Sequence, residues 1–244
     1  MISRLRALKR RVFGPHLPVF PVEARQIEYS AILSMDDEPA HPSDRLLDLA
    51  LGAAEHARTI SMAAVTQRMK APPYYPEVWP GEHYKLLAGL VLQQKPQLVI
   101  EIGTAAGLSA LAIRPYLPEG SRLVTFDIVP WEQFPGVCLN ANDFADGVLR
   151  QVLGDVAETE VMRRHADLFR TADLIFVDGP KDGKFERVFL DRLAEINMSQ
   201  RPVIVFDDIR LWQMLAIWRG IRRPKLDITS FGHWSGTGLV DWTS

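Results

Sequence analysis

Acidic residues close several short apolar runs in the second half of the chain. Asp178 ends the run 172–178, and the pair Asp207 and Asp208 ends the run 201–208. Three carboxylates that lie close together raise one another's pKa unless a cation lies among them, and oxygen ligands select a hard divalent ion such as Mg²⁺. These three residues therefore predict a metal site. Helix caps at the same aspartates are the alternative interpretation.

A turn with two glycines follows another apolar run. The segment 101–109 reads EIGTAAGLS and begins with Glu101. Glycines let a ligand approach the backbone, and the N–H groups at a helix start favour an anion. A dinucleotide site would need glycine at position 105, where this chain has alanine. The turn therefore fits a smaller anion, such as an amino-acid carboxylate near Gly103 and Gly107 with the Ser109 hydroxyl as donor. A tight turn that binds nothing is the alternative.

Two more acidic residues stand at the ends of apolar runs. Asp127 lies 20 residues after Gly107, where a carboxylate can accept hydrogen bonds from both hydroxyls of a ribose. Asp155 ends the run 150–155, and together with Val156 it stands where an adenine edge would lie. The two positions extend the predicted site from a small anion to a nucleoside.

Lys181 follows Asp178 by three residues in the loop PKDGK. A metal ion lowers the pKa of a hydroxyl that it binds, and a nearby amine can accept the proton. Lys181 can act as that base only if its own pKa is depressed, because a solvated lysine is protonated at neutral pH. Asp182 is the reserve candidate, and an ordinary surface lysine is the alternative interpretation.

The elements that must position these residues alternate along the chain. Apolar runs that are buried on both faces and alternate with helices are typical of a parallel sheet covered on both sides. In such a sheet the carboxyl ends of the strands share one edge, where ligands bind. The expected strands are 97–102, 122–127, 150–155, 172–178 and 201–208, and the expected helices are 107–116, 137–149, 157–170 and 183–198. The runs 226–231 and 238–242, joined by a turn, predict a terminal antiparallel hairpin.

Residues 1–80 differ from this pattern and predict a helical appendage to a domain at 81–244. The stretch 42–70 has helix-forming composition with Ser43 as N-cap, and 81–94 predicts another helix. Between them, four prolines in 71–81 predict a stiff loop. The aromatic residues of this loop either cover the site or pack against the domain; they are Tyr74, Tyr75 and Trp79. Those of the hairpin turn, His233 and Trp234, either border the substrate pocket or face solvent. His83 starts a helix and fits no zinc pattern.

The composition excludes several classes of protein. The net charge is −2, so no global field attracts nucleic acid, and the single cysteine, Cys138, cannot form an internal disulfide. No run of about 18 apolar residues is present, so we expect a soluble, cytoplasmic protein. Residues 1–11 carry five Lys and Arg. They predict either a weak membrane contact or a solvated arm, and a homodimer through the apolar N-terminal helices is a further expectation.

The glycine turn with Asp127 and the terminal hairpin resembles the class I S-adenosylmethionine-dependent methyltransferases over residues 80–244. The resemblance implies a Rossmann-like α/β fold with a mostly parallel seven-stranded sheet, and S-adenosylmethionine (SAM) as cofactor. It implies that the turn from Glu101 holds the methionine part through Gly103, Gly107 and Ser109. By the same resemblance, Asp127 holds the ribose, and Asp155 and Val156 hold the adenine.

The acids after the fourth and fifth strands look like those of the metal-dependent small-molecule O-methyltransferases, the group that includes catechol O-methyltransferase. That family has Asp-Asn after the fifth strand; Asp208 replaces the Asn, as in bacterial sugar O-methyltransferases of macrolide tailoring. A lysine also follows the first metal Asp by three residues, as Lys181 does. The resemblance implies methyl transfer to a sugar, catechol or phenol hydroxyl with Mg²⁺. A metal-independent methyltransferase, a non-catalytic binding module and a nicotinamide dehydrogenase are the alternatives.

Overall fold

A sheet of seven strands forms the centre of the computed structural model, which describes residues 40–71 and 74–242. The strands are β1 (Leu98–Ile102), β2 (Arg122–Asp127), β3 (Leu149–Leu153), β4 (Leu174–Val177), β5 (Val203–Asp207), β6 (Lys225–Asp227) and β7 (Thr237–Asp241). Their order across the sheet is β3-β2-β1-β4-β5-β7-β6, and the first five strands are parallel. The predicted mostly parallel, Rossmann-like sheet is therefore confirmed. The basic segment 1–11 lies outside the described residues, so its predicted membrane contact stays a prediction.

The central strands β1, β4 and β5 are buried at every residue. Their sequences LVIEI, LIFV and VIVFD carry apolar side chains toward both faces, as expected for parallel strands covered by helices on both sides. The last strand, β7, runs antiparallel to β5 and to β6, which confirms the terminal hairpin. The strand predicted at 226–231 is shorter than expected. Asp227 accepts a hydrogen bond from the amide of Thr229, and this local turn ends β6 before a short 3₁₀ helix, Thr229–Phe231.

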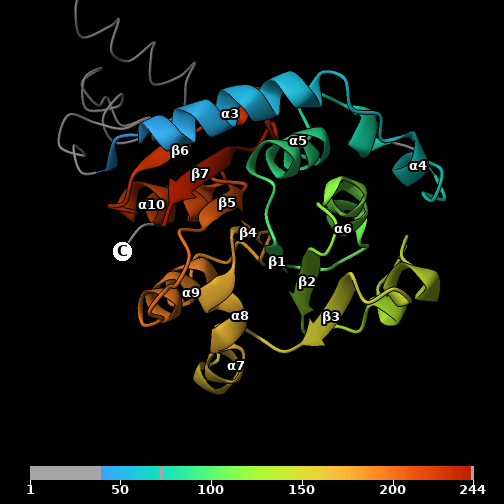
Figure 1. Cartoon of the computed structure of the whole chain (residues 1–244). Coiled ribbons are helices and arrows are strands. Elements are labelled where there is room, and N and C mark those ends of the chain that lie inside the picture. Colours follow the sequence, from blue (N-terminus) through green and yellow to red (C-terminus); the bar gives the residue numbers. More distant parts are fainter. Residues whose placement is uncertain (1–39, 72–73, 243–244) are drawn as a thin grey trace, which may run out of the picture.

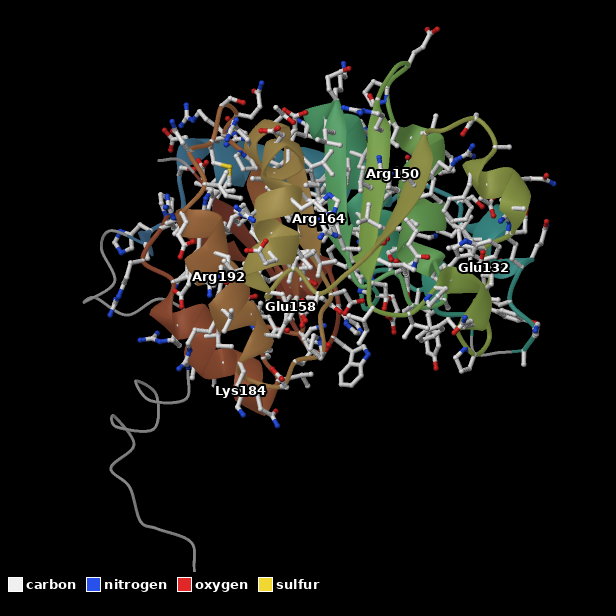
Figure 2. All side chains as sticks on the ribbon, turned by 90° about the horizontal axis from the view of Figure 1, so that it is seen from below. Glu132, Arg150, Glu158, Arg164, Lys184 and Arg192 are labelled. Atoms are coloured by element: carbon white, nitrogen blue, oxygen red, sulfur yellow. The ribbon has the colours of Figure 1, made fainter. Side chains whose placement is uncertain are left out.

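Helices cover both faces of the sheet (Figure 1). On one face lie α3 (Asp44–Ala57), α4 (Ala63–Thr66), α5 (Tyr84–Gln94) and α6 (Leu108–Ile113), whose buried side chains join one hydrophobic core. The opposite face carries α7 (Thr159–Arg164), α8 (Ala166–Thr171), α9 (Phe185–Ala194) and α10 (Trp212–Gly220), which join a second core. Figure 2 shows the outer side of this second layer, with charged side chains such as Arg164 and Arg192 on its surface.

Two of the predicted helices differ from the structure. The segment 137–149 contains only a short 3₁₀ helix, Ala141–Phe144, so the predicted α-helix is wrong. The side chains of Asn140 and Asp143 bond to nearby backbone amides and so compete with continued helical pairing, and Gly147 turns the chain at a positive φ. The helix predicted at 157–170 is divided into α7 and α8 at His165, whose backbone is not helical.

Helix α3 packs against α5 in the first helical layer. Ser43 accepts a hydrogen bond from the amide of Leu46, which confirms it as the N-cap of α3. Its hydroxyl also bonds to Asp241 in β7. Further along, α3 meets α5 where Gly89 faces the backbone: a Cβ at Gly89 would lie 2.3 Å from the carbonyl oxygen of Ala53. The helical appendage and the sheet domain therefore share one core.

We expect Gly89→Ala to destabilise the protein by about 1–3 kcal/mol, because the added methyl group must separate α3 from α5. Gly220→Ala is the matched control. Gly220 is likewise helical, as the last residue of α10, and a Cβ there would meet no atom within 4 Å. Its substitution should leave the free energy of unfolding unchanged or raise it by up to about 1 kcal/mol. Urea unfolding followed by circular dichroism measures both variants, and equal stabilities would contradict the close packing of α3 on α5.

Candidate active site

The two glycines of the turn after β1 are required by the fold of the chain itself. Gly103 has φ +100°, and a Cβ there would lie 2.3 Å from the carbonyl oxygen of Asp178. Gly107 has φ +83°, and a Cβ there would lie 2.2 Å from the side chain of Leu139. Larger residues at either position would be strained and would collide. The turn after β1 is therefore pressed against the end of β4, which places the predicted cofactor turn beside the first predicted metal ligand.

Asp127 holds the middle of this turn. Its Oδ2 accepts a hydrogen bond of 3.0 Å from the amide of Ala105, whose φ of 44° is unusual for alanine, and its Oδ1 accepts one of 3.0 Å from the amide of Val129. The amide of Gly154 bonds to the carbonyl oxygen of Asp127 at 2.9 Å, which brings the end of β3 beside it. The predicted methionine, ribose and adenine positions thus line adjoining loops at the carboxyl ends of β1, β2 and β3.

Asp155 and Val156 lie just beyond Gly154. Asp155 Oδ1 accepts a hydrogen bond of 2.8 Å from the amide of Ala157, which makes a tight turn before α7, and Val156 is buried in the core of the second layer. Asp155 thus has a local structural role as well as the position that the resemblance gives to an adenine contact.

Glu101 is a buried carboxyl group inside β1. Burial raises its pKa to about 7, although the neighbouring hydroxyls of Ser109 and Thr125 oppose the rise. Ser109 is itself buried at the start of α6. Glu101 and Ser109 therefore lie beneath the glycine turn, where they can support its shape, while Gly103 and Gly107 form the turn itself.

Lys181 joins two of the predicted metal ligands. Its Nζ lies 2.5 Å from Asp178 Oδ1 and 3.4 Å from Asp208 Oδ2, and it also donates to the carbonyl oxygen of Gly179 at 3.0 Å. Burial favours the neutral amine, but the negative charges of Asp178 and Asp207 outweigh it and raise the pKa of Lys181. The base role predicted for Lys181 requires the opposite shift. In this arrangement Lys181 is a protonated partner of the carboxylates, and Asp182 instead caps α9 by accepting hydrogen bonds from backbone amides.

Asp207 is contacted by two histidines. His233 Nδ1 lies 3.0 Å from Asp207 Oδ1, and His83 Nδ1 lies 3.5 Å from the same oxygen. Burial alone would raise the pKa of Asp207, but the charge of His83 and the hydrogen bond with His233 hold it well below its usual range. The aspartates in turn shift the pKa of His233. Burial disfavours its protonated form, but its hydrogen bonds with Asp207 and Asp208 raise its pKa to about 10. His233 is therefore not a solvated turn residue, as one interpretation of the sequence held.

The three predicted metal ligands fall into two overlapping groups. Asp178 and Asp207 join His83, and Asp207 and Asp208 join His233; in each group, one ligand atom per residue lies within 4.8 Å of the others. No group found among the described residues holds Asp178 and Asp208 together. These two instead share the ammonium group of Lys181. Asp207 is thus common to both groups and is the centre of the cluster.

Sequence reasoning missed Glu82, His83 and Ser235 as site residues. Glu82 Oε2 lies 3.3 Å from His233 Nε2, and the hydroxyl of Ser235 bonds to Asp208 Oδ1. The signal that could have found them is topological. A terminal strand that runs antiparallel begins at the carboxyl edge of the parallel strands, so the turn before it must lie beside the acids.

The proline-rich loop is tied to that same turn. The Nε1 of Trp79 donates a hydrogen bond of 2.8 Å to the carbonyl oxygen of Phe231. The amide of Gly81 donates to the carbonyl oxygen of Gly232, and the amide of Trp234 donates to the carbonyl oxygen of Gly81. These contacts draw Glu82 and His83 to the acids. Tyr74 and Tyr75 of this loop remain exposed.

Part of the chain is similar to known methyltransferases. Residues 100–209 match the model of a family described as a methyltransferase domain. The O-methyltransferase TomG from Streptomyces achromogenes, involved in tomaymycin synthesis and solved with SAM, is 17% identical over 86% of this chain and 100% of that chain, with a TM-score of 0.50. The SAH-bound methyltransferase PaMTH1 from Podospora anserina is 18% identical over 95% of this chain and 100% of that chain, with a TM-score of 0.48. No curated protein matches the chain.

The match runs from within β1 to just past β5, so it includes the glycine turn and the acids of β4 and β5. The fold is that of the class I SAM-dependent methyltransferases, as the sequence resemblance predicted. In the part of the chain that the structure describes, no helix has the length and apolar character needed to span a membrane.

Glu101 makes the free energy of unfolding of the protein depend on pH. Its pKa is about 7 in the folded protein against 4.5 for the free group, so the folded protein retains the proton that the unfolded chain loses. Stability is therefore lost as pH rises from about 4.5 to 7, and Glu101→Gln removes this loss. Relative to the unaltered protein, the variant should gain on the order of 2 kcal/mol between pH 5.5 and 8.5. Urea unfolding of both proteins at the two pH values measures the difference, and parallel pH profiles would contradict a buried, protonated Glu101.

Proposed function

We propose that this protein transfers the methyl group of SAM to a hydroxyl of a small molecule, and that a divalent cation held by Asp178 and Asp207 assists. The observation that carries the proposal is the contact between the two halves of the site. The backbone at Gly103 is pressed against Asp178, so the turn proposed for the cofactor adjoins the acids proposed for the cation. A methyl donor and an acceptor hydroxyl bound there would lie next to each other.

The donor set of the acidic cluster fits a divalent cation. Asp178 and Asp207 end neighbouring strands, and their oxygens lie within 4.8 Å of each other and of a nitrogen of His83. Bound together, SAM and the cation would supply a sulfonium methyl group and Lewis acidity: the O–C bond would form as the S–C bond breaks, S-adenosylhomocysteine would leave, and the hydroxyl proton would pass to a carboxylate of the acidic cluster. The protein's own contribution is to hold the two reactants in line and to exclude water.

The residues of the chain have separate parts in this proposal. Gly103, Gly107 and the buried Ser109 shape the turn for the methionine part, and Asp127 accepts the ribose hydroxyls with the lone pairs that its backbone bonds leave free. Lys181 holds Asp178 in place through their 2.5 Å contact. The exposed Tyr74 and Tyr75 offer aromatic surface to an acceptor of sugar, catechol or phenol type.

A metal-independent methyltransferase is the second candidate, and a specific observation favours it. Lys181, His83 and His233 already supply positive charge to the three aspartates. The carboxylates therefore have cationic partners within the protein itself. In this case Asp207 would serve to orient His233, and the acids would shape the acceptor pocket without binding an ion.

Asp178→Ala should lower turnover on a hydroxyl acceptor by at least about 100-fold, because the cation site loses one of its ligands. The same variant should bind S-adenosylhomocysteine with nearly unchanged affinity by calorimetry. Treatment with a chelator should reproduce the loss in the unaltered protein. Asp167→Ala is the control, since Asp167 is an exposed aspartate paired with Arg170 on α8. Full turnover after chelation and in Asp178→Ala would favour the metal-independent candidate.

Asp127→Ala should show the reverse pattern. Removing this carboxylate releases the amide of Ala105 and removes the proposed acceptor for the ribose hydroxyls. We expect the dissociation constant for S-adenosylhomocysteine to rise by at least about tenfold, because one charge-assisted contact contributes about 1.5–3 kcal/mol. Calorimetry measures the change. Unaltered binding would contradict the placement of a SAM nucleoside at this edge of the sheet.

A further inference from the structure

His83 is a buried side chain without a hydrogen-bond partner at the centre of the acidic cluster. Only 4% of the residue is exposed, and neither ring nitrogen has a hydrogen-bond partner in the described part of the chain. Its Nδ1 points to Asp207, at 3.5 Å from Oδ1 but outside hydrogen-bond geometry. Buried imidazoles are ordinarily hydrogen-bonded, whereas His83 has only a loose ion pair with Asp207, so its ring nitrogens retain capacity for a further partner.

The position of His83 is fixed by its surroundings. It precedes α5, and its ring lies 4.3 Å from the ring of Tyr84 and 5.3 Å from that of Phe176, measured between centroids. The backbone pairing of Gly81 with the hairpin turn holds the segment from the other side. The imidazole therefore has little freedom to turn toward another partner.

The ligand atoms of His83, Asp178 and Asp207 are spaced closely enough to share one ion. They lie within 4.8 Å of one another. Ligand bonds of about 2.0–2.2 Å place the donor atoms on one metal ion roughly 3–4 Å apart. Closing the group around an ion therefore requires only a small movement of each side chain, with Asp178 exchanging part of its contact with Lys181 for the ion.

We propose that His83 is the third ligand of the cation, and that the site accordingly takes a first-row transition metal ion in preference to Mg²⁺. This inference rests on the proposed function, since it concerns the cation invoked there. Mg²⁺ is bound through oxygen ligands and retained waters, whereas imidazole suits ions such as Co²⁺, Ni²⁺, Fe²⁺ and Zn²⁺. One nitrogen among two carboxylates therefore changes the preference of a site that the acids alone would make selective for magnesium.

The second histidine does not compete for this role. His233 Nδ1 lies 3.0 Å from Asp207 Oδ1 and 2.9 Å from the hydroxyl of Ser235, and its Nε2 lies 3.3 Å from Glu82. Both of its nitrogens are thus engaged with the protein. We assign His233 to the positioning of Asp207, and His83 to the ion.

The test uses the full chain stripped of metal with a chelator, titrated separately with Co²⁺ and with Mg²⁺ by calorimetry. The unaltered protein should bind Co²⁺ more tightly than Mg²⁺. His83→Gln should weaken Co²⁺ binding by at least about tenfold and leave Mg²⁺ binding nearly unchanged. His56→Gln is the matched control, because His56 lies on α3 and belongs to no group of possible metal ligands among the described residues. Equal affinity of the unaltered protein for the two ions, or unchanged Co²⁺ binding in His83→Gln, would overturn the proposal.

A spectroscopic readout keeps the test valid if His83→Gln does not fold. Pulsed electron paramagnetic resonance of bound Mn²⁺ detects coupling to a ligand nitrogen. The coupling should be present in the unaltered protein and should persist in His233→Gln, which leaves His83 as the histidine of the cluster. Its absence from His233→Gln would overturn the assignment of His83.

The same measurements separate this inference from the proposed function. Nitrogen-coupled metal binding together with turnover that resists chelation would support the ligand assignment and contradict metal assistance. Chelator-sensitive turnover with no nitrogen coupling would support metal assistance and overturn the ligand assignment.

Discussion

The contact between Gly103 and Asp178 is the constraint on which the site depends. β1 and β4 are neighbours in the sheet, and the chain leaving β1 passes so close to the carbonyl oxygen of Asp178 that no side chain fits at position 103. The turn proposed for the methionine part of the cofactor therefore adjoins the first of the acids. Two reactants held in adjoining sites lose most of their relative freedom before reaction, and this contributes a large part of the rate in group transfer.

Much of this edge of the sheet could be predicted from the sequence, because its strands carry a strong local signal. β1, β4 and β5 are short, apolar and buried on both faces, which is a strong local signal for parallel strands. Once strands are parallel, their carboxyl ends must share an edge. The proximity of Asp178 and Asp207 follows from the fold class alone, and so does the place of Asp127 at the end of β2.

Other features arise from contacts that leave no local pattern. His83 and His233 are 150 residues apart in the sequence, and they meet because a few backbone hydrogen bonds join Gly81 to the turn before β7. Neither histidine lies in a spaced motif, so neither could be assigned to the acids beforehand. The segment 137–149 was misjudged for a related reason, because side-chain bonds from Asn140 and Asp143 to the backbone override an average helix propensity.

The charge balance of the cluster limits what a cation can do there. Three aspartates and Glu82 lie against Lys181 and two imidazoles, which come from different segments of the chain. These basic groups offset the mutual repulsion of the acids. In the proposed cation site, an entering ion would compete with Lys181 for Asp178 and with the proton of His83, because an imidazole ligand binds metal only in its neutral form. Metal binding at such a site would be coupled to proton release, and it would link the charge of the acids to the presence of the ion.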